Sequence, residues 1–286
     1  MLEKHHIKGN TYDEERALYH LEDTLVEDCT FAGPADGESA LKESRNITVK
    51  DTTFSLRYPL WHTIGFELDH VSMDDKTRAA IWYAENGNIH DSKLNGIKVL
   101  RECRNISLTT CEADSIELGW KCKKIEIKDC VMNSQYFLFE ADDVEIDNLT
   151  MTGKYSLQYM NRVHINHSKL DTKDAFWHSK DVLVENSIVK GEYLGWYSEN
   201  LTFVNCEIEG TQPLCYCKNL KLINCTMKNT DLSFEYSEVD ADIKGSILSV
   251  KNPKSGKIVA DEIGEIILEN SIMEDTCDII ERKLQK

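Results

Sequence analysis

The chain has 286 residues, a formal net charge of −17 at pH 7 and a sequence pI near 5.0. This acidity disfavours nucleic acid and anionic membranes as partners, because their phosphates would be repelled by the average field of the protein. No apolar run approaches the roughly 18 residues of a membrane-spanning helix, so no transmembrane segment is expected.

The compartment is predicted from the amino-terminal stretch and the cysteines. Residues 1–21 lack the apolar segment of a signal peptide. Ten cysteines without such a signal favour reduced thiols and a cytoplasmic protein. No motif indicates a cofactor.

A repeat of 19 residues organises the chain. Segments of alternating aliphatic and polar residues begin at Cys122, Ala141, Met160, Ser179, Ser198 and Cys217. Such a period indicates a solenoid, and alternation with period two indicates strands. We predict an all-β fold, a single-stranded right-handed parallel β-helix of about 13 coils with about 19 residues each, and irregular capping coils at both ends.

We expect one domain over residues 1–286. Residues 1–22 are predicted to form an edge strand or short cap, and residues 92–235 the most regular coils. The Pro/Gly/Ser cluster at 251–257 predicts the one extended loop, and residues 274–286 read as a charged tail.

Two aliphatic columns are predicted to point inward, one containing Ile125 and Val182 and the other Ile127 and Val184. A third column is predicted to lie at a corner, because Asn, Asp and His tolerate left-handed backbone and stacked amides can bond one another. Its members are Asp129, Asn148, His167, Asn186, Asn205 and Asn224.

The cysteines also fall in columns, and two interpretations remain open. Small inward side chains filling a narrow core are the favoured one. The alternative is a four-thiolate zinc site at Cys206, Cys215, Cys217 and Cys225, whose spacing matches no zinc ribbon or finger. We predict no metal site.

A third strand in each coil has the least ordinary composition. Alternation predicts that its first, third and fifth residues face solvent, including the apolar column Leu100, Gly119, Leu138, Leu157, Phe176, Gly195 and Leu214. The same rule turns Trp120, Trp177 and Trp196 inward, although a bulge here would turn some of them outward. Glu102, Lys121 and Glu140 alternate in sign and predict a solvated charge ladder.

The Tyr-rich coils predict a platform for sugars, with rings stacking on apolar sugar faces. The candidate binding residues are Tyr155, Tyr159, Lys173, Trp177, Tyr193, Trp196, Tyr197 and Gln212. If the protein is an enzyme, glycoside hydrolysis or lyase chemistry needs an acid and a base. Asp174 is the first catalytic candidate, followed by His178 and Glu192.

Several unusual strings resemble an uncharacterised bacterial family with a pectin-lyase-like β-helix, catalogued as domain of unknown function 3737. They are ERALYH at Glu15, YPLWH at Tyr58, RAAIWY at Arg78, KDAFW at Lys173, GEYLGW at Gly191, GTQPLCYC at Gly210 and SFEYS at Ser233. The resemblance covers nearly the whole chain and implies the fold but no activity.

The wider pectin-lyase-like group contains polysaccharide lyases, polygalacturonases and esterases. Of the polygalacturonase motifs only Asp142–Asp143 occurs, at a predicted turn, and the acids that a calcium-dependent lyase needs do not converge near Arg101. The function hypotheses are therefore a carbohydrate or glycoconjugate binder, with enzymatic processing left open, or a structural scaffold. The scaffold would use the Tyr/Leu face for a partner or a homodimer.

Overall fold

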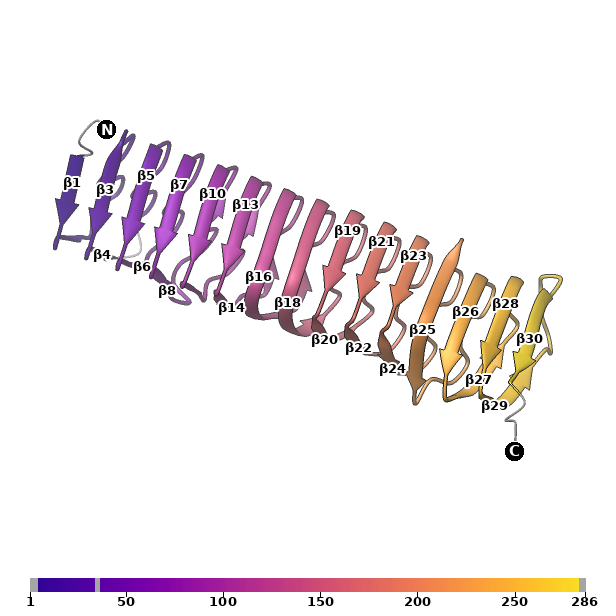
Figure 1. Ribbon diagram of the computed structural model, residues 1–286. Helices are drawn as coiled ribbons and strands as arrows, with labels where there is room; N and C mark the ends of the chain where they lie inside the picture. The colour runs from indigo at the N-terminus through magenta and orange to yellow at the C-terminus, as the bar shows by residue number, and fades with distance from the viewer. Residues whose placement is uncertain (1–4, 34–36, 283–286) are drawn as a thin grey trace. The chain divides into compact units, whose positions relative to one another are not determined.

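The computed structural model describes residues 5–33 and 37–282. It is an all-β parallel solenoid of about 14 turns with about 19 residues per turn, which confirms the predicted fold class. Two compact units make up the chain, residues 1–145 and 146–286, and each is a stack of coils (Figure 1). No helix in the described ranges is long and apolar enough to cross a membrane. The assignment of the chain to one domain stays a prediction.

The unit of residues 1–145 has three strand columns with parallel pairing. The first contains β1 (His5–Lys8), β3 (Thr24–Glu27), β5 (Arg45–Lys50), β7 (Ile64–Asp69), β10 (Glu85–His90), β13 (Arg104–Thr109) and the start of β16 (Lys123–Ser134). The second contains β2 (Thr11–Tyr12), β4 (Thr30–Ala32), β6 (Thr53–Ser55), β8 (Ser72–Met73), β11 (Lys93–Leu94), β14 (Glu112–Asp114) and the end of β16. The third contains β9 (Ile81–Trp82), β12 (Leu100–Arg101), β15 (Glu117–Leu118) and β17 (Tyr136–Phe137).

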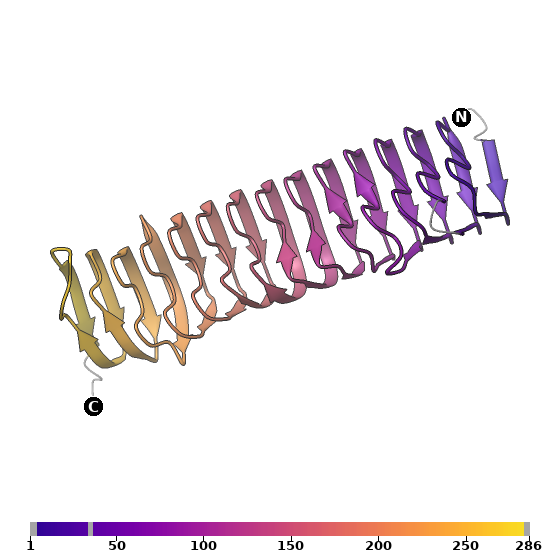
Figure 2. The same ribbon diagram turned by 180° about the vertical axis from the view of Figure 1, so that it is seen from behind.

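In the unit of residues 146–286 the third side of the coils contains no strand between residues 155 and 219, and this side is seen in Figure 2. β18 (Asp142–Lys154) leads into the unit. The first two sides contain β19 (Asn161–Asn166), β20 (Lys169–Lys173), β21 (Lys180–Glu185), β22 (Ile188–Lys190), β23 (Glu199–Val204), β24 (Glu207–Glu209) and β25 (Leu220–Lys228). The last coils contain β26 (Glu238–Lys244), β27 (Ser246–Lys251), β28 (Ser255–Ala260), β29 (Glu262–Ile267) and β30 (Thr276–Glu281).

The predicted inward columns form the core. Ile125, Ile127, Val182 and Val184 are each at most 3% exposed. Successive side chains in a column differ in volume, and a large one fills the space beside a small one. A Cβ on Gly87 would lie 2.1 Å from Cζ of Phe66, so the large ring on one coil fills the space that the glycine on the next leaves open.

The corner column has the predicted left-handed backbone, with φ between 48° and 56° from Asp129 to Asn224. Its amides also bond from coil to coil. Asn205 Nδ2 donates to Asn186 Oδ1 at 3.1 Å, and Asn224 Nδ2 donates to Asn205 Oδ1 at 2.5 Å. The asparagines thus satisfy both the turn and the ladder.

The buried cysteines act as small polar core residues. All ten are free thiols, and all but Cys277 are buried. Cys206 Sγ donates to the carbonyls of Val184 and Val204, both at 3.3 Å, and Cys225 Sγ bonds to carbonyls in the same pattern. Ser168 and Ser187 occupy equivalent positions and bond to the carbonyl two residues earlier. The buried positions of these thiols agree with the favoured interpretation, in which small side chains fill a narrow core.

The amino-terminal end contains the predicted edge strand, whereas the carboxy-terminal end differs from the prediction. Residues 5–12 form a paired coil, β1 and β2, which adds a coil at the amino-terminal end. The predicted loop at 251–257 is a short connection, because β27 ends at Lys251 and β28 begins at Ser255. The predicted tail contains β30, which pairs with β28 in parallel, and residues 283–286 of that tail lie outside the described part.

Candidate functional site

The third side of the unit of residues 146–286 follows an alternating left-handed backbone instead of a strand. At Asp174, Phe176 and His178 φ is 56°, 64° and 54°, and equivalent positions of neighbouring coils repeat this. This geometry breaks the alternation of a strand, so the third residue of the segment points inward. Leu157, Phe176 and Leu214 are fully buried. The prediction of an exposed apolar column is therefore wrong.

The same correction holds in the unit of residues 1–145, where Leu100 and Leu138 are at most 3% exposed. Both belong to the column that strand alternation placed on the outside. An apolar partner surface along this column is accordingly absent from the described part of the chain. A dimer or partner interface cannot use these leucines, because they are buried.

The tryptophans of the fourth position lie half-buried along the coil. Trp177 Nε1 donates to the carbonyl of Tyr193 at 2.6 Å, and Trp196 Nε1 donates to that of Gln212 at 2.8 Å. The two indoles stack with centroids 5.5 Å apart and planes 6° apart. Trp120 is also half-buried. The direction of these side chains, which the sequence left open, is therefore neither fully inward nor outward, and each indole contacts the next coil.

The fifth position forms an aromatic ladder, by which we mean Tyr159, His178, Tyr197, Tyr216 and Tyr236. From Tyr159 to Tyr216, neighbouring ring centroids lie 5.0, 5.0 and 4.7 Å apart with planes within 13° of parallel. Tyr216 and Tyr236 are 5.6 Å apart and tilted by 45°. The spacing is close to that of the coils, about 4.8 Å.

Tyr236 enters the ladder through a change of register. A constant period places Glu235 in this column, but the Tyr216 N–H donates to the Glu235 carbonyl at 2.7 Å and the Cys217 N–H donates to Ser237 Oγ at 2.9 Å. This coil is thus one residue longer, and Tyr236 takes the left-handed position with φ 56°. The aromatic ladder therefore continues at Tyr236 and not at Glu235.

The ladder presents ring edges, not ring faces. Parallel stacking covers both faces of His178 and Tyr197, while Tyr159 and Tyr197 remain 48% and 45% exposed. A sugar cannot stack on these faces as predicted, because the neighbouring rings of the ladder already cover them. What remains is a row of ring edges and phenol groups, each able to donate and accept a hydrogen bond.

A charged group lies at the start of the segment, formed by Asp174 at the first position and by Lys173 and Glu192, which each precede that position in their coils. Lys173 Nζ is 2.7 Å from Glu192 Oε2 and 5.1 Å from the centroid of the Tyr193 ring. The Asp174 N–H donates to the Glu192 carbonyl at 2.9 Å, and Asp174 is only 6% exposed. Burial raises the pKa of Asp174, with Lys173 opposing the shift and Glu192 adding to it.

The predicted site residues thus separate into two groups. Asp174, Glu192, Lys173 and Tyr193 lie together, and the half-buried Tyr155 and Gln212 occupy the equivalent first position of other coils. His178 stacks in the ladder instead. Among the described residues no hydrogen bond or ion pair joins its ring to Asp174 or Glu192, so the three catalytic candidates do not form one connected centre.

Two further groups were missed. One is an aromatic cluster in the unit of residues 1–145, where His62 and Tyr83 stack at 5.0 Å and Trp61 and Trp82 lie 6.4 Å apart. The signal in the sequence is a Trp followed by His or Tyr. It occurs at 61–62, 82–83, 177–178 and 196–197.

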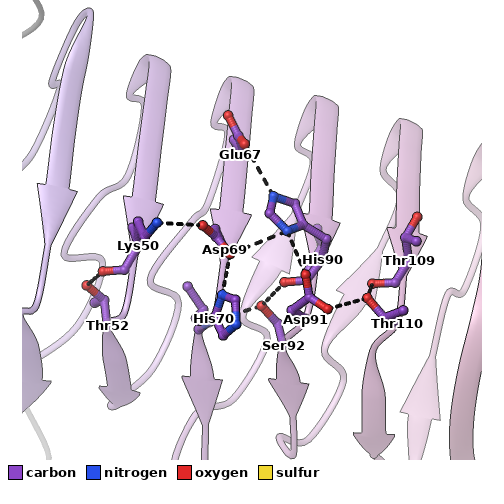
Figure 3. Close-up of polar contacts among 12 residues, drawn as sticks. Lys50, Thr52, Glu67, Asp69, His70, His90, Asp91, Ser92, Thr109 and Thr110 are labelled. Carbon is purple, nitrogen blue, oxygen red and sulfur yellow. Dashed lines mark hydrogen bonds and ion pairs between the residues drawn. The ribbon is translucent and has the colours of Figure 1, made fainter.

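The other is a corner cluster, by which we mean Asp69, His70, His90 and Asp91, at the ends of β7 and β10 (Figure 3). His90 Nδ1 lies 3.2 Å from Asp91 Oδ2 and 3.4 Å from Asp69 Oδ1, and His70 Nδ1 bonds to Asp69 Oδ1. The hydrogen bond from Thr110 and the contact with His90 hold the pKa of Asp91 below its usual value. An Asp–His pair at 69–70 and a His–Asp pair at 90–91 were the available signal.

A family model described as "Protein of unknown function (DUF3737)" matches residues 5–280. The chain belongs to the DUF3737 family. A search of curated proteins gives no match to this DUF3737 chain. Its fold is similar to that of PfbA, a surface adhesin of Streptococcus pneumoniae, with a TM-score of 0.55 and 9% identity over 79% of this chain and 82% of that one.

Two other solved structures also match this DUF3737 protein. The A-module of the mannuronan C-5 epimerase AlgE6 of Azotobacter vinelandii has a TM-score of 0.42 and 11% identity, covering 96% of this chain and 88% of that one. A tailspike of E. coli bacteriophage HK620 has a TM-score of 0.42 and 11% identity, covering 91% and 60%. At these identities the likeness concerns the fold alone.

Proposed function

We propose that this DUF3737 protein binds an extended carbohydrate or glycoconjugate along the aromatic ladder. The observation that carries the proposal is the ladder itself, five rings on successive coils, of which Tyr159, His178 and Tyr197 are exposed and Tyr216 and Tyr236 half-buried. Phenol groups that recur at the coil spacing suit a linear ligand whose hydroxyl groups also recur along its length. Half-buried Trp177 and Trp196 add apolar surface beside the row.

Binding without catalysis is the activity we favour. Glu192 is paired with Lys173, and Asp174 is buried beside them. Neither carboxylate is therefore placed as the acid or the base that must lie on either side of the glycosidic bond to be cleaved. His178 offers its ring edge, because its faces are stacked. The Lys173–Glu192 pair serves here as a polar contact for ligand hydroxyls at the side of the ladder.

The decisive test removes the hydroxyl groups of two tyrosines and keeps their rings. Tyr197→Phe combined with Tyr216→Phe preserves the stack and deletes two donors, each worth about 1 kcal/mol or roughly fivefold in affinity. A glycan and polysaccharide array should identify ligands retained by the unaltered protein. Binding to them, measured by biolayer interferometry, should weaken more than tenfold in the double variant.

The matched control is Tyr83→Phe, an exposed tyrosine at the fifth position of a coil in residues 1–145. It should leave the affinity unchanged. If the array retains nothing, or if the double variant binds as well as the unaltered protein, the proposal is wrong. A stable dimer in light scattering that protects Tyr197 from modification would favour the alternative, a protein-interaction scaffold.

A further inference from the structure

The corner cluster is built from two adjacent coils of the unit of residues 1–145. β7 and β10 pair in parallel with Asp69 opposite His90, and the next residue in each chain, His70 or Asp91, has a left-handed backbone with φ 53° or 50°. One ligand atom each from Asp69, His70 and Asp91 falls within 4.8 Å of the others. Coil pairing therefore holds three metal-ligating side chains at one point (Figure 3).

His90 is oriented as a fourth donor. Its Nε2 lies 3.2 Å from Glu67 Oε1, and its Nδ1 faces Asp69 and Asp91. With an ion bound, the contact with Glu67 would keep the ring proton on Nε2 and leave Nδ1 to ligate the metal. A carboxylate bonded to the far nitrogen is the usual outer partner of a histidine that ligates a metal. Glu67 and His90 come from neighbouring strands, so the sheet sets this orientation.

The distances fit a small divalent ion. Two ligands at about 2.0–2.1 Å from a tetrahedral ion lie about 3.3 Å apart. The separations of His90 Nδ1 from Asp91 Oδ2 and Asp69 Oδ1 are 3.2 and 3.4 Å. Other contacts occupy the remaining carboxylate oxygens. Lys50 Nζ lies 3.2 Å from Asp69 Oδ2, and Thr110 Oγ1 donates to Asp91 Oδ1 at 2.6 Å.

We propose that Asp69, His70 and Asp91, with His90 as the fourth donor, bind one divalent transition-metal ion of the zinc class. Imidazole donors favour Zn²⁺, Co²⁺, Ni²⁺ and Cu²⁺ over Mg²⁺ and Ca²⁺, which prefer oxygen. His70 and Asp91 have side chains 60% and 46% exposed, so an ion reaches the cluster from solvent. The bound ion links two coils, and the site is independent of the proposed glycan ligand.

The experiment titrates tag-free, metal-stripped protein with Co²⁺, followed by visible absorption, and with Zn²⁺, followed by calorimetry. One ion should bind per chain. Asp91→Asn and His70→Ala should each weaken binding about tenfold or more, and Glu67→Gln less, because it removes the charge of the outer partner only. Circular dichroism of each variant checks that the fold is kept.

Two controls separate this site from other donors. His167→Ala removes a corner histidine that contacts a single carboxylate, Asp147 at 3.0 Å, and should change nothing. The double variant His5→Ala, His6→Ala removes the exposed amino-terminal pair and should also bind normally. The proposal is overturned if no ion binds, if Mg²⁺ competes at equal concentration, or if Asp91→Asn and His70→Ala both bind as the unaltered protein does.

Discussion

The fifth position of the coil has opposite chemistry in two regions of the chain. In the last coils of residues 1–145, after the stacked pair of His62 and Tyr83, it carries Glu102, Lys121 and Glu140, with Lys121 Nζ 3.7 Å from Glu140 Oε2. In residues 146–286 it carries the aromatic ladder. The backbone at this one position is the same in both, since φ at Lys121 is 55° and at His178 is 54°. The coil therefore sets where a side chain lies, and the residue type alone sets what the surface can do.

The spacing of the coils explains both ladders. Like charges about 4.8 Å apart repel, so charged residues are stable in this column only when their signs alternate. Aromatic rings at the same separation attract when they are stacked, so identical residues are stable there. Stability explains the alternating charges of the charge ladder. The exposed edges of the aromatic ladder are in addition available to a ligand.

The largest expected effect tests whether the third position of the coil is buried in each unit. Phe176→Ala and Leu138→Ala each remove a buried side chain of the third position and should cost about 2–5 kcal/mol in urea unfolding. Leu248→Ala, at a leucine that is 53% exposed, should cost less than about 0.5 kcal/mol. A loss of unfolding free energy near zero at both Phe176 and Leu138 would show that the third position lies at the surface.

Double-mutant cycles should distinguish the ladders by their response to salt. The coupling of Tyr197 with Tyr216 should be about 0.5–1.5 kcal/mol and should persist in 1 M NaCl. The coupling of Lys121 with Glu140 should be about 0.2–1 kcal/mol and should fall in 1 M NaCl, where the Debye length is about 3 Å. Equal salt sensitivity of the two cycles would contradict this division.

Asp174 offers a pH test in the aromatic half. Burial raises the pKa of this carboxyl in the folded state above its ordinary 3.8, so the folded protein binds the proton more tightly than the unfolded chain does. Ionised Asp174 therefore lowers stability at neutral pH, and this cost disappears as the pH falls through the folded value to about 3.8. Asp174→Asn should raise the Tm at pH 7 and leave it unchanged near pH 3.5.

The matched variant for that test is Glu140→Gln in the charge ladder. It should slightly lower the Tm at pH 7, because it removes the partner of Lys121. A Tm for Asp174→Asn that is unchanged or lower at pH 7 would show that the ionised carboxylate is stabilised by its neighbours.

The smallest expected effect is that of a reductant. The thiols that the structure describes are free, and burial raises the pKa of Cys217 to about 11. Burial, with Asp275 and Asp278 nearby, raises the pKa of the half-buried Cys277 to about 12. Dithiothreitol should leave the Tm unchanged, and alkylation of the native protein should reach Cys277 before any other cysteine. A large fall in Tm would contradict the cytoplasmic location, which stays a prediction.

Much of the fold could be predicted because a solenoid repeats the same local structure, and the residue types that favour it, in every coil. A single aliphatic residue is weak evidence, but Ile125 and Val182 occur in columns that repeat it at every coil, and their burial was expected. The corner asparagines were predicted for the same reason, since left-handed backbone favours that residue type. Period, strand character, core and corners thus follow from the order of residues.

The candidate site could be predicted less well, because it depends on features that residue type does not specify. Leu157 and Phe176 adopt left-handed backbone although neither favours it, and this turns them inward. Tyr236 joins the ladder only because its coil is one residue longer. The stacking that covers the ring faces, and the meeting of Asp69, His70 and Asp91 at one corner, arise from the spacing between coils. Contacts between coils decide these features, because each needs atoms about 20 residues apart in the chain to meet in space.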